Sequence, residues 1–444
     1  MTERALGMTA GARGTTTLPR ALLCCVAVLA LAACGGGTDD DVVTLRFWGM
    51  GREGEVVGEL AREFERENPG IRVQVQQIPW TAAHEKLLTS HVGRATPDVA
   101  QLGNTWVPEF AAIEALEPLD TWIARSGIVD SSAYFAGIWN TNIVHDTVYG
   151  IPWYVDTRVL FYRTDLLARA GYDSIPTTWA GWLDAMRAVK RELGPDRYAI
   201  FLPTNEWAQP IVFGQQAGSP ILKEDGRWAA FGDSAFRRGF EFYVGIFEEG
   251  LAPRIGNTQM ANVFQEFARG TFAMYITGPW NIGEFKRRLP DEVQDAWATA
   301  PLPGPTGAAS GVSTAGGSSI VMFRGTEHKE AAWKLIEFLA RPEQQSRFFE
   351  LTGSLPAREE AWQDPALIGD PYARAFWTQL QRVEPLPQVP EIELIVTKVF
   401  ERAETAIRGG VPVEEALANL DREVNAILAK RRWMMDRATG RPDE

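Results

Sequence analysis

The chain has 444 residues, of which 45% are hydrophobic and 23% are charged, and its mean hydropathy is −0.16. This composition excludes a disordered chain and a polytopic membrane protein, and the length predicts two domains or lobes with cores of their own. With 57 acidic against 44 basic side chains, the net charge of −13 disfavours nucleic acid and anionic lipid as partners. All three cysteines lie in the first 34 residues, which excludes a disulfide framework or a cysteine-ligated zinc site in the rest of the chain.

The first 34 residues resemble a bacterial lipoprotein signal. Arginines precede an apolar run over residues 21–30, which is too short to span a bilayer and ends in Leu31-Ala-Ala-Cys34. We expect residues 1–33 to be removed on export and Cys34 to carry a lipid on the periplasmic or extracellular face of the cell membrane. An ordinary cleavage site beside an incidental cysteine is the alternative.

Residues 34–41 are rich in glycine and aspartate and are predicted to be a flexible tether. No later stretch approaches about 18 uninterrupted apolar residues, so we expect membrane contact only through the N-terminal lipid.

Strand and helix periods alternate from residue 42 to about residue 323. Residues 44–48 and 71–75 are predicted strands, and the helix between them, 55–68, carries its apolar side chains on one stripe. This order predicts a parallel pair of strands with a right-handed crossover. Further strands and helices are expected at 98–102, 159–162, 165–170, 182–189 and 198–202.

The last third of the chain is predicted to be mainly helical. Its clearest helices are expected at 331–339, 343–351, 372–381 and 396–407. The fold class is therefore α/β with a helical C-terminal third.

A glycine-rich segment over residues 49–54 has the G-x-G-x-x-G spacing of a dinucleotide-binding loop, after a strand and before a helix. No acidic residue that would bind the ribose lies in residues 68–84. We therefore expect this loop to direct a helix N-terminus, with Arg52 and Glu53, towards some other ligand.

Catalytic and metal motifs are incomplete. Residues 311–315 lack the last glycine of a nucleophile elbow, and His84 lacks the second histidine of a zinc-protease helix. We expect no enzymatic activity, no cofactor and no metal.

Tryptophans at predicted loops are the leading candidates for ligand contacts. Five of the 16 tryptophans fall at or just beyond strand ends, namely Trp48, Trp106, Trp153, Trp207 and Trp280. The apolar face of a pyranose can lie on an indole ring, while its hydroxyls need carboxylate, amide and guanidinium partners. The alternative is that each of these tryptophans only fills an interface between lobes. Polar neighbours suited to a sugar are Asn104, Thr105, Asp156, Asn205, Glu206 and Asn281.

A series of short motifs stands in a fixed order along most of the chain after residue 42. They are Phe47-Trp48-Gly49, Thr96-Pro97-Asp98-Val99, Tyr149-Gly-Ile-Pro152, Leu160-Phe-Tyr-Arg-Thr-Asp-Leu-Leu167, Phe267-Ala-Arg-Gly270, Gly278-Pro279-Trp280, Pro301-Leu-Pro-Gly304, Gly316-Gly317 and Gly353-Ser-Leu-Pro356. In this order, behind a lipoprotein signal, they resemble the bacterial extracellular solute-binding proteins of carbohydrate ABC importers.

The resemblance implies a two-lobed periplasmic-binding-protein fold of type II character, with a cleft between the lobes and a hinge of several crossing segments. Lobe 1 is expected to comprise residues 42–154 with 314–362, and lobe 2 residues 155–313 with 363–432, followed by a tail over 433–444. It also implies a monomer without catalytic activity, which captures a solute and hands it to a permease driven by a cytoplasmic ATPase.

Site residues follow from the resemblance motif by motif. Trp280 corresponds to a sugar-stacking tryptophan and Asp156 to an acidic ligand-binding residue, while Arg358 is expected to reach into the cleft. The loops at 52–53 and 104–106 correspond to first-lobe hydroxyl contacts. The full set of expected ligand-binding residues is Arg52, Glu53, Asn104, Thr105, Trp106, Trp153, Asp156, Asn205, Glu206, Trp207, Trp280, Asn281, Gly316 and Arg358.

One departure from the family concerns ligand size. The maltose-binding protein carries another stacking tryptophan in its C-terminal helical region, whereas Glu391–Val396 here contain no aromatic residue. This favours a mono- to short oligosaccharide, such as a disaccharide. A glycerophosphodiester or a polyol is the rival ligand, and an exported glycoside-active enzyme with two carboxylates about 5 to 10 Å apart is the rival function.

Overall fold

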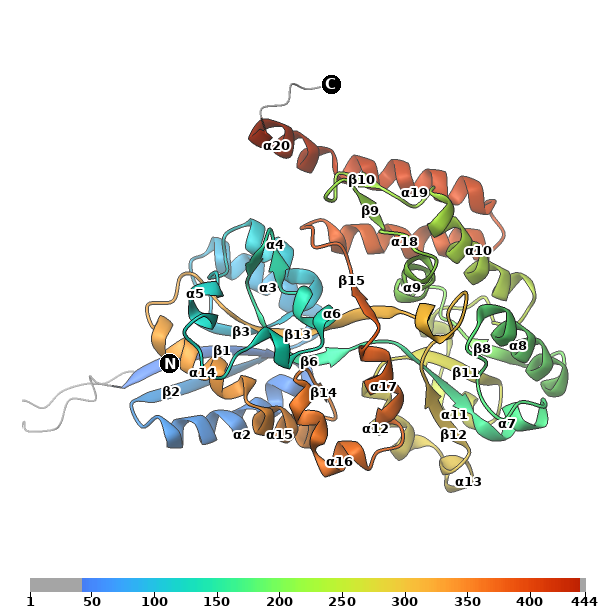
Figure 1. Cartoon of the computed structure of the whole chain (residues 1–444), viewed down its shortest axis with the longest axis horizontal. Coiled ribbons are helices and arrows are strands. Elements are labelled where there is room, and N and C mark those ends of the chain that lie inside the picture. The colour runs from blue at the N-terminus through green and yellow to red at the C-terminus, as the bar shows by residue number, and fades with distance from the viewer. Residues whose placement is uncertain (1–41, 440–444) are drawn as a thin grey trace, which may run out of the picture. The chain divides into compact units, whose positions relative to one another are not determined.

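The computed structural model describes residues 42–439, which form an α/β structure with two main sheets (Figure 1). The chain from Val43 onward is one compact unit. The predicted signal peptide, the lipidation site Cys34 and the tether lie outside the described residues. Within these residues, no helix is both long and apolar enough to cross a membrane.

The larger sheet contains seven of the strands formed by the described residues, in the order β14-β6-β13-β3-β1-β2, with β15 paired to β13. Strand β1 (Val43–Met50) and strand β2 (Ile71–Ile78) are parallel and joined by α2 (Gly51–Glu67), as the hydrophobic pattern predicts. Strand β3 (Val99–Gly103) lies parallel to the other side of β1. The long strand β13 (Ser313–Met322) runs antiparallel between β3 and β6 (Ile151–Asp156).

The smaller sheet has the order β12-β7-β11-β8. Its strands are β7 (Val159–Arg163), β8 (Tyr198–Phe201), β11 (Phe272–Thr277) and β12 (Trp297–Ala300). Only Thr157 and Arg158 separate β6 from β7, so the chain passes from one sheet to the other almost without a loop. It returns through residues 301–312 into β13, which pairs with β6 (Figure 1).

These crossings bear on the predicted lobe boundaries. Strand β6 remains in the larger sheet as far as Asp156, two residues beyond the predicted end of lobe 1 at residue 154. Strand β15 (Val383–Pro385) pairs in parallel with the start of β13, so a third segment of the chain lies near the two that pass between the sheets.

The helical C-terminal part ends in α17 (Ala373–Leu380), α18 (Ile392–Ile407), α19 (Val413–Ile427) and α20 (Ala429–Thr439). Helices α18 and α19 pack on α9 (Ala208–Gln216) and α10 (Ser234–Glu248) beside the smaller sheet. The tail predicted from residue 433 is wrong for residues 433–439, because they continue α20, whose Asp436 forms an ion pair with Arg227.

The remaining helices and short strands are α3 (Trp80–Val92), α4 (Val107–Ala112), α5 (Asp120–Ile123), α6 (Ala136–Asn140), α7 (Thr164–Arg169), α8 (Trp179–Leu193), α11 (Val263–Ala268), α12 (Trp280–Arg288), α13 (Asp291–Gln294), α14 (Lys329–Ala340), α15 (Pro342–Thr352), α16 (Pro365–Ile368), β4 (Ile143–Val144), β5 (Thr147–Val148), β9 (Leu222–Lys223), β10 (Trp228–Ala229) and β14 (Leu355–Pro356).

Buried apolar side chains form three clusters, whose members all lie between Leu45 and Leu428. One cluster fills the space around β1, α2 and α14 and continues to the smaller sheet, where Phe161 contacts Phe376 and stacks on Trp297. The second lies among α8, α10, α18 and α19. Among the described residues, burial of these apolar side chains is the main driving force for folding.

Candidate functional site

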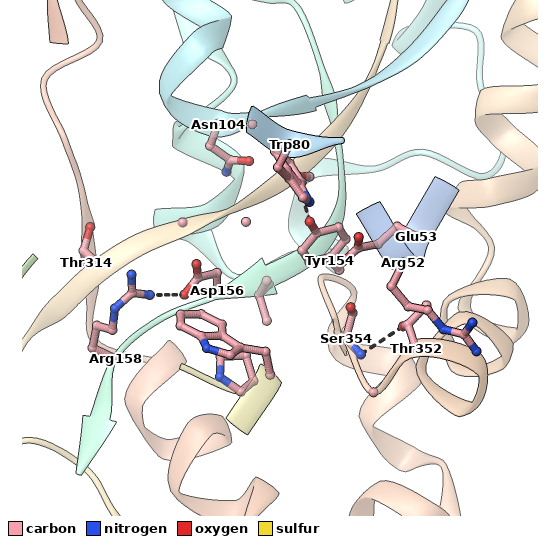
Figure 2. A pocket seen from close by; sticks show the side chains of 18 of the residues that line it. Arg52, Glu53, Trp80, Asn104, Tyr154, Asp156, Arg158, Thr314, Thr352 and Ser354 are labelled. Atoms are coloured by element: carbon pink, nitrogen blue, oxygen red, sulfur yellow. Dashed lines mark hydrogen bonds and ion pairs between the residues drawn. The ribbon is translucent and has the colours of Figure 1, made fainter. Parts of the chain in front are cut away.

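A cleft of about 790 Å³ is lined by side chains that follow strands of both sheets (Figure 2). Its volume lies within the range of about 300 to 1,000 Å³ that is typical of small-molecule sites. The larger sheet contributes residues from β3, β6 and β13, and α12, which follows β11 of the smaller sheet, contributes Trp280 and its neighbours. Loops near residues 158, 207 and 353 complete the lining.

The glycine-rich loop forms one wall of the cleft. Gly51 has a φ of +51°, and a Cβ on Gly54 would lie 2.4 Å from the carbonyl oxygen of Gly49, so this tight passage from β1 into α2 needs glycine at these places. The turn brings Arg52 and Glu53 to the cleft. The loop thus presents these two side chains to the cleft at the start of α2, as predicted.

Glu53 is a partly buried carboxylate with several donors around it. The side chains of Trp80, Tyr154 and Ser354 lie near its carboxylate as possible hydrogen-bond donors. Burial raises the pKa of Glu53 above its usual value, and these hydrogen bonds act in the opposite direction. Glu53 thus places a carboxylate acceptor on the cleft wall.

The Tyr154 hydroxyl connects Glu53 to the strands behind it. It accepts hydrogen bonds from Gln101 Nε2 at 3.1 Å and from Ser318 Oγ at 3.0 Å. Gln101 in turn accepts from the backbone N–H of Met50 at 2.7 Å. Strands β1, β3, β6 and β13 are thus tied together directly behind the cleft.

Asn104 offers an acceptor to the cleft. Its side chain is 4% exposed, and its Nδ2 donates to Thr141 Oγ1, which itself donates to the carbonyl of Ile138 at 2.7 Å. This arrangement fixes the orientation of the amide, because Thr141 Oγ1 has no second proton to give. Asn104 Oδ1 is left without a hydrogen-bond partner among the described residues, so a ligand donor would satisfy it.

At the end of β6, Asp156 and Arg158 form an ion pair, and the Arg158 guanidinium lies 4.7 Å from the centre of the Trp280 ring. The Asp156 side chain is 30% exposed and that of Arg158 is 11% exposed. Burial raises the pKa of Asp156, the charge of Glu206 adds to this effect, and Arg158 opposes it.

Trp280 is half exposed, which is unusual for an indole in this chain. A Cβ on Gly278 would lie 1.8 Å from Cζ3 of Trp280, so the Gly-Pro-Trp sequence leaves room for the ring to fold back over its own turn. Gly283, Glu284 and Arg287 follow Trp280 at helical spacing on α12 and also line the cleft. The position of the indole ring is therefore set by its close contact with Gly278 and by the Arg158 guanidinium over the ring.

Nine of the predicted ligand-binding residues line this cleft, and their contact with a ligand remains a prediction. They are Arg52, Glu53, Asn104, Thr105, Trp106, Asp156, Trp207, Trp280 and Gly316. Asn205 and Glu206 are adjacent to the lining without being part of it. The Asn205 side chain accepts from the backbone N–H of Asn257 at 2.7 Å, and Glu206 acts through its charge on Asp156.

Trp153 and Asn281 do not line the cleft, which corrects the prediction for both. Trp153 is 1% exposed and stacks on Phe348 at 4.0 Å between ring centres. Along β6 its side chain alternates with that of Tyr154, which lines the cleft. Asn281 is 6% exposed, and its Nδ2 donates to Thr277 Oγ1 at 2.7 Å.

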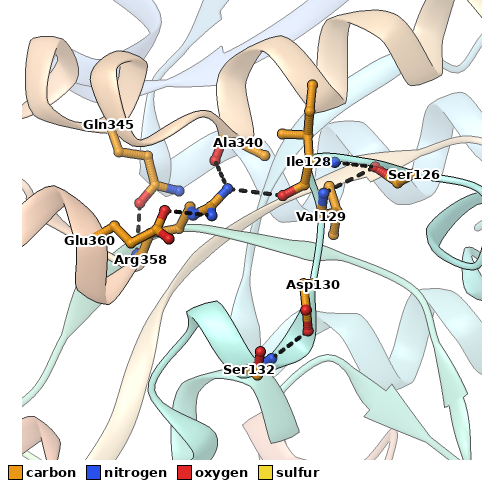
Figure 3. A network of polar contacts seen from close by, with 9 residues as sticks. All are labelled: Ser126, Ile128, Val129, Asp130, Ser132, Ala340, Gln345, Arg358 and Glu360. Carbon is orange, nitrogen blue, oxygen red and sulfur yellow. Dashed lines mark hydrogen bonds and ion pairs between the residues drawn. The ribbon is translucent and has the colours of Figure 1, made fainter.

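Arg358 does not reach the cleft either, contrary to the prediction. Its Nη1 donates to the carbonyls of Ile128 at 2.9 Å and Ala340 at 3.2 Å, and its Nη2 pairs with Glu360 at 2.8 Å (Figure 3). The residue is 6% exposed. Arg358 therefore joins three segments of the larger-sheet side and is unavailable to a ligand.

Several cleft residues were missed by the sequence analysis, although two simple patterns point to them. Tyr154 precedes Asp156 by two positions on a strand, so both lie on one face of β6. Trp80 follows the end of β2, the same criterion that selected the other tryptophans. The further missed residues are Arg158, Glu284, Arg287, Thr314, Ser318, Thr352 and Ser354.

No group of three or more His, Cys, Asp or Glu side chains suited to a metal ion occurs within residues 42–439.

Comparisons with known proteins agree with this geometry. A family model for bacterial extracellular solute-binding proteins matches residues 51–346. The structure of the sugar-binding protein MalE from the phytopathogen Xanthomonas citri has a TM-score of 0.86 and 49% sequence identity, covering 89% of this chain and 99% of that chain. This match supports the predicted two-lobed fold.

More distant relatives cover similar lengths. The galactooligosaccharide-binding protein of Bacillus subtilis is 23% identical over 410 residues, which are 89% of this chain and 93% of the relative. An uncharacterized lipoprotein of Streptomyces antibioticus is 29% identical over 381 residues, 82% of this chain and 81% of the relative. The chain described here belongs to the family of bacterial extracellular solute-binding proteins.

Proposed function

We propose that this protein is a lipid-anchored, extracytoplasmic solute-binding protein that captures a carbohydrate in its cleft and delivers it to the permease of an ABC importer. The ligand is a mono- to short oligosaccharide, such as a disaccharide. The similarity to MalE of Xanthomonas citri, a sugar-binding protein, supports this class of ligand. The protein acts as a monomer and without catalysis.

The observation that carries the proposal is the pairing of a half-exposed indole with fixed polar groups across the cleft. Trp280 offers an apolar surface to a pyranose face, and Arg158, which lies over its ring, pairs with Asp156. Glu53 and Asn104 also line the cleft, and Asn104 Oδ1 has no hydrogen-bond partner among the described residues. A sugar has both an apolar face and a ring of hydroxyl donors, so it satisfies both walls at once.

The charges in the cleft favour a neutral ligand over a glycerophosphodiester. Its cationic side chains are each paired with a carboxylate among the described residues: Arg52 with Glu55, Arg158 with Asp156, and Arg287 with Glu284. A phosphodiester needs an uncompensated cation, because moving its charge out of water is costly without one. A neutral polyhydroxyl ligand requires no such charge.

A thermal-shift screen followed by calorimetric titration tests the ligand class. Mono- and disaccharides, polyols and glycerophosphodiesters are compared at equal concentration, since a ligand that binds only the folded state raises the unfolding temperature. We expect a disaccharide or smaller sugar to give the largest shift. A larger shift with a glycerophosphodiester would contradict the proposal.

Chromatography of the bound sugar after overnight incubation separates binding from hydrolysis. Recovery of the intact sugar is expected, whereas conversion to shorter products would support the glycoside-active alternative.

Ligand binding is expected to close the cleft, because a ligand gains contacts from both lobes only in the compact form. Small-angle scattering should therefore show a smaller radius of gyration at saturation with sugar. An unchanged profile would count against a hinge between the lobes.

The lipid anchor is tested by Cys34→Ser. We expect the variant to leave the membrane fraction of the native host, with the fold of residues 42–439 unchanged. Wild-type protein found in the soluble fraction would show that the lipoprotein interpretation is wrong.

A further inference from the structure

Helix α20 (Ala429–Thr439) carries an unusual set of side chains for an acidic protein. Its residues 429–437 contain four basic side chains and one acidic one, in a chain whose net charge is −13. It also exposes Trp433 and Met434, each to 47%. Exposed tryptophan and methionine side chains at the surface of a folded domain indicate a contact surface.

The inner side of α20 is fixed to the domain by arginines. Arg431 is 7% exposed and donates to the carbonyl of Asp225 at 3.1 Å. The guanidinium of Arg432 lies 4.0 Å from the ring centre of Trp228 and donates to the carbonyls of Arg227 and Asn425. The orientation of the helix on the hairpin formed by β9 and β10 is thereby set.

The outer side of α20 consists of Lys430, Trp433, Met434 and Arg437, which we call the α20 face. Their spacing of three, four and seven residues places them on one side of a helix, and all four are exposed. The Arg437 guanidinium lies 4.8 Å from the centre of the Trp433 ring. Neither Lys430 nor Arg437 forms an ion pair with a carboxylate among residues 42–439. Two apolar side chains thus lie between two cations that have no such partner.

From this arrangement we propose that the α20 face docks on an anionic phospholipid surface. Tryptophan prefers the boundary between lipid headgroups and acyl chains, and flanking Lys and Arg side chains extend to the phosphates. The α20 face has both kinds of side chain on one side of the helix: Trp433 and Met434 are apolar, and Lys430 and Arg437 are cationic. It gives the domain a second membrane contact, in addition to the lipid predicted on Cys34.

The size of the face favours a lipid surface over a protein partner. A stable protein interface takes roughly 20 to 30 residues from each side, whereas the α20 face has four. A few interfacial side chains are enough for weak, reversible membrane contact. The net negative charge of the whole chain does not prevent this, because charges more than about 10 Å from the lipid surface are largely screened at ordinary ionic strength.

Vesicle co-sedimentation of a protein comprising residues 42–444 tests the proposal without the N-terminal lipid. This part of the chain contains the three clusters of buried apolar side chains found among the described residues, so we expect it to fold without residues 1–41. Vesicles of phosphatidylcholine with phosphatidylglycerol are compared with vesicles of phosphatidylcholine alone, at low and high salt. We expect sedimentation only with the anionic vesicles, and its loss at high salt.

Two variants of the face are compared with wild type. Removing the indole in Trp433→Ser should lower the partition constant about tenfold, because the apolar insertion is lost. Lys430→Gln with Arg437→Gln should lower it about 25-fold, since each cation near an anionic surface contributes a factor of about five.

The matched controls are Ile368→Ser on α16, which removes an apolar side chain that is 60% exposed, and Arg66→Gln, which removes an exposed cation of α2. Both should sediment like wild type. All variants should keep the sugar affinity of wild type, so failure of the sugar proposal and failure of this one are separate results.

Three outcomes overturn the proposal. These are equal binding to anionic and zwitterionic vesicles, no binding of wild type, or sedimentation of Trp433→Ser equal to that of wild type. Light scattering that shows a wild-type dimer, lost in Trp433→Ser, without vesicle binding would instead assign the face to contact with a second copy.

Discussion

Two buried arginines, Arg158 and Arg358, have different surroundings. Arg158 belongs to the candidate ligand cleft, whereas Arg358 contacts only other parts of the fold. Arg158 is 9% exposed and Arg358 is 6% exposed. Arg358 gives its terminal nitrogens to two backbone carbonyls and to Glu360, away from the cleft (Figure 3). Arg158 instead pairs with Asp156 at the cleft wall and lies over Trp280 (Figure 2).

The two arginines differ in where the partners of their guanidinium groups lie. Around Arg358 the acceptors come from segments of the fold that a ligand does not reach, so its hydrogen bonds contribute to stability. Around Arg158 the partners Asp156 and Trp280 are themselves partly exposed to the cleft. Burial of a charged side chain therefore does not identify a site, whereas the position of its partners on a cleft wall does: Asp156 and Trp280 line the cleft, and Glu360 does not.

The largest effect is expected for Arg358→Met, which should lower the free energy of unfolding by about 3 to 5 kcal/mol. The carbonyls of Ile128 and Ala340 lose their charged donor, and each buried acceptor left unsatisfied costs about 1 to 3 kcal/mol, whereas the exposed Glu360 carboxylate remains in contact with water. Urea denaturation measures the change, and calorimetry should show an unaltered sugar affinity for the folded fraction. If the folded variant binds sugar more weakly than wild type, Arg358 contributes to the ligand site after all.

Trp280→Ala comes next and acts on binding instead of on stability. Loss of the stacking surface should reduce affinity by roughly 2 to 4 kcal/mol, on the order of 30- to 1000-fold, and similarly for every sugar the protein accepts. Because the ring is half exposed, the free energy of unfolding should change little. Calorimetric titration with two epimers measures both the loss and its uniformity.

Gly278→Ala is the matched variant for Trp280, since it keeps the indole but removes the space for it. We expect a smaller loss than in Trp280→Ala. Wild-type affinity in both variants would show that Trp280 only packs between the lobes.

The sequence predicts the scaffold better than the site. The β1–α2–β2 unit and strands β3, β7 and β8 follow from periods of two and 3.6 residues, which depend on local burial alone, whereas β11, β12 and β13 were not predicted individually. The same reasoning predicted both Trp153 and Trp280 to contact the ligand, although Trp153 is buried and Trp280 is half exposed. Alternation along β6 separates Trp153 from its neighbours Tyr154 and Asp156, so that error was avoidable.

Other parts of the site depend on contacts that no local pattern contains. Arg358 acquires its partners from residues 128 and 340, which are near in space and distant in sequence. The free acceptor of Asn104 depends on Thr141 taking its amide hydrogen. Such pairings are set by the tertiary fold, so the sequence alone did not predict them.

Asp156→Ala should cost about 1 to 3 kcal/mol in affinity, less than the loss of the indole and different in kind. The carboxylate accepts from particular hydroxyls, so the loss should fall on ligands that place a donor there and spare an epimer that does not. Titration of the variant with the best sugar and one epimer measures this contrast. Equal losses for both sugars would show that Asp156 only orients Arg158.

The smallest effect is the pH dependence of binding. Burial raises the pKa of both Glu53 and Asp156 in the free protein, and hydroxyl donors bind the ionised form of a carboxylate. Acid therefore weakens binding, because protonation removes the acceptor, and the loss begins at a higher pH than for carboxyl groups in water.

Affinity should be constant near neutral pH and fall as the pH drops through the raised pKa values, by at most about tenfold per unit and per group. Titrations in a series of buffers measure this profile. Asp156→Asn keeps the shape of the side chain without its titration, so its profile should lose one of the two components. Binding that stays constant into the range where exposed carboxyl groups protonate would show that neither carboxylate accepts a hydrogen bond from the sugar.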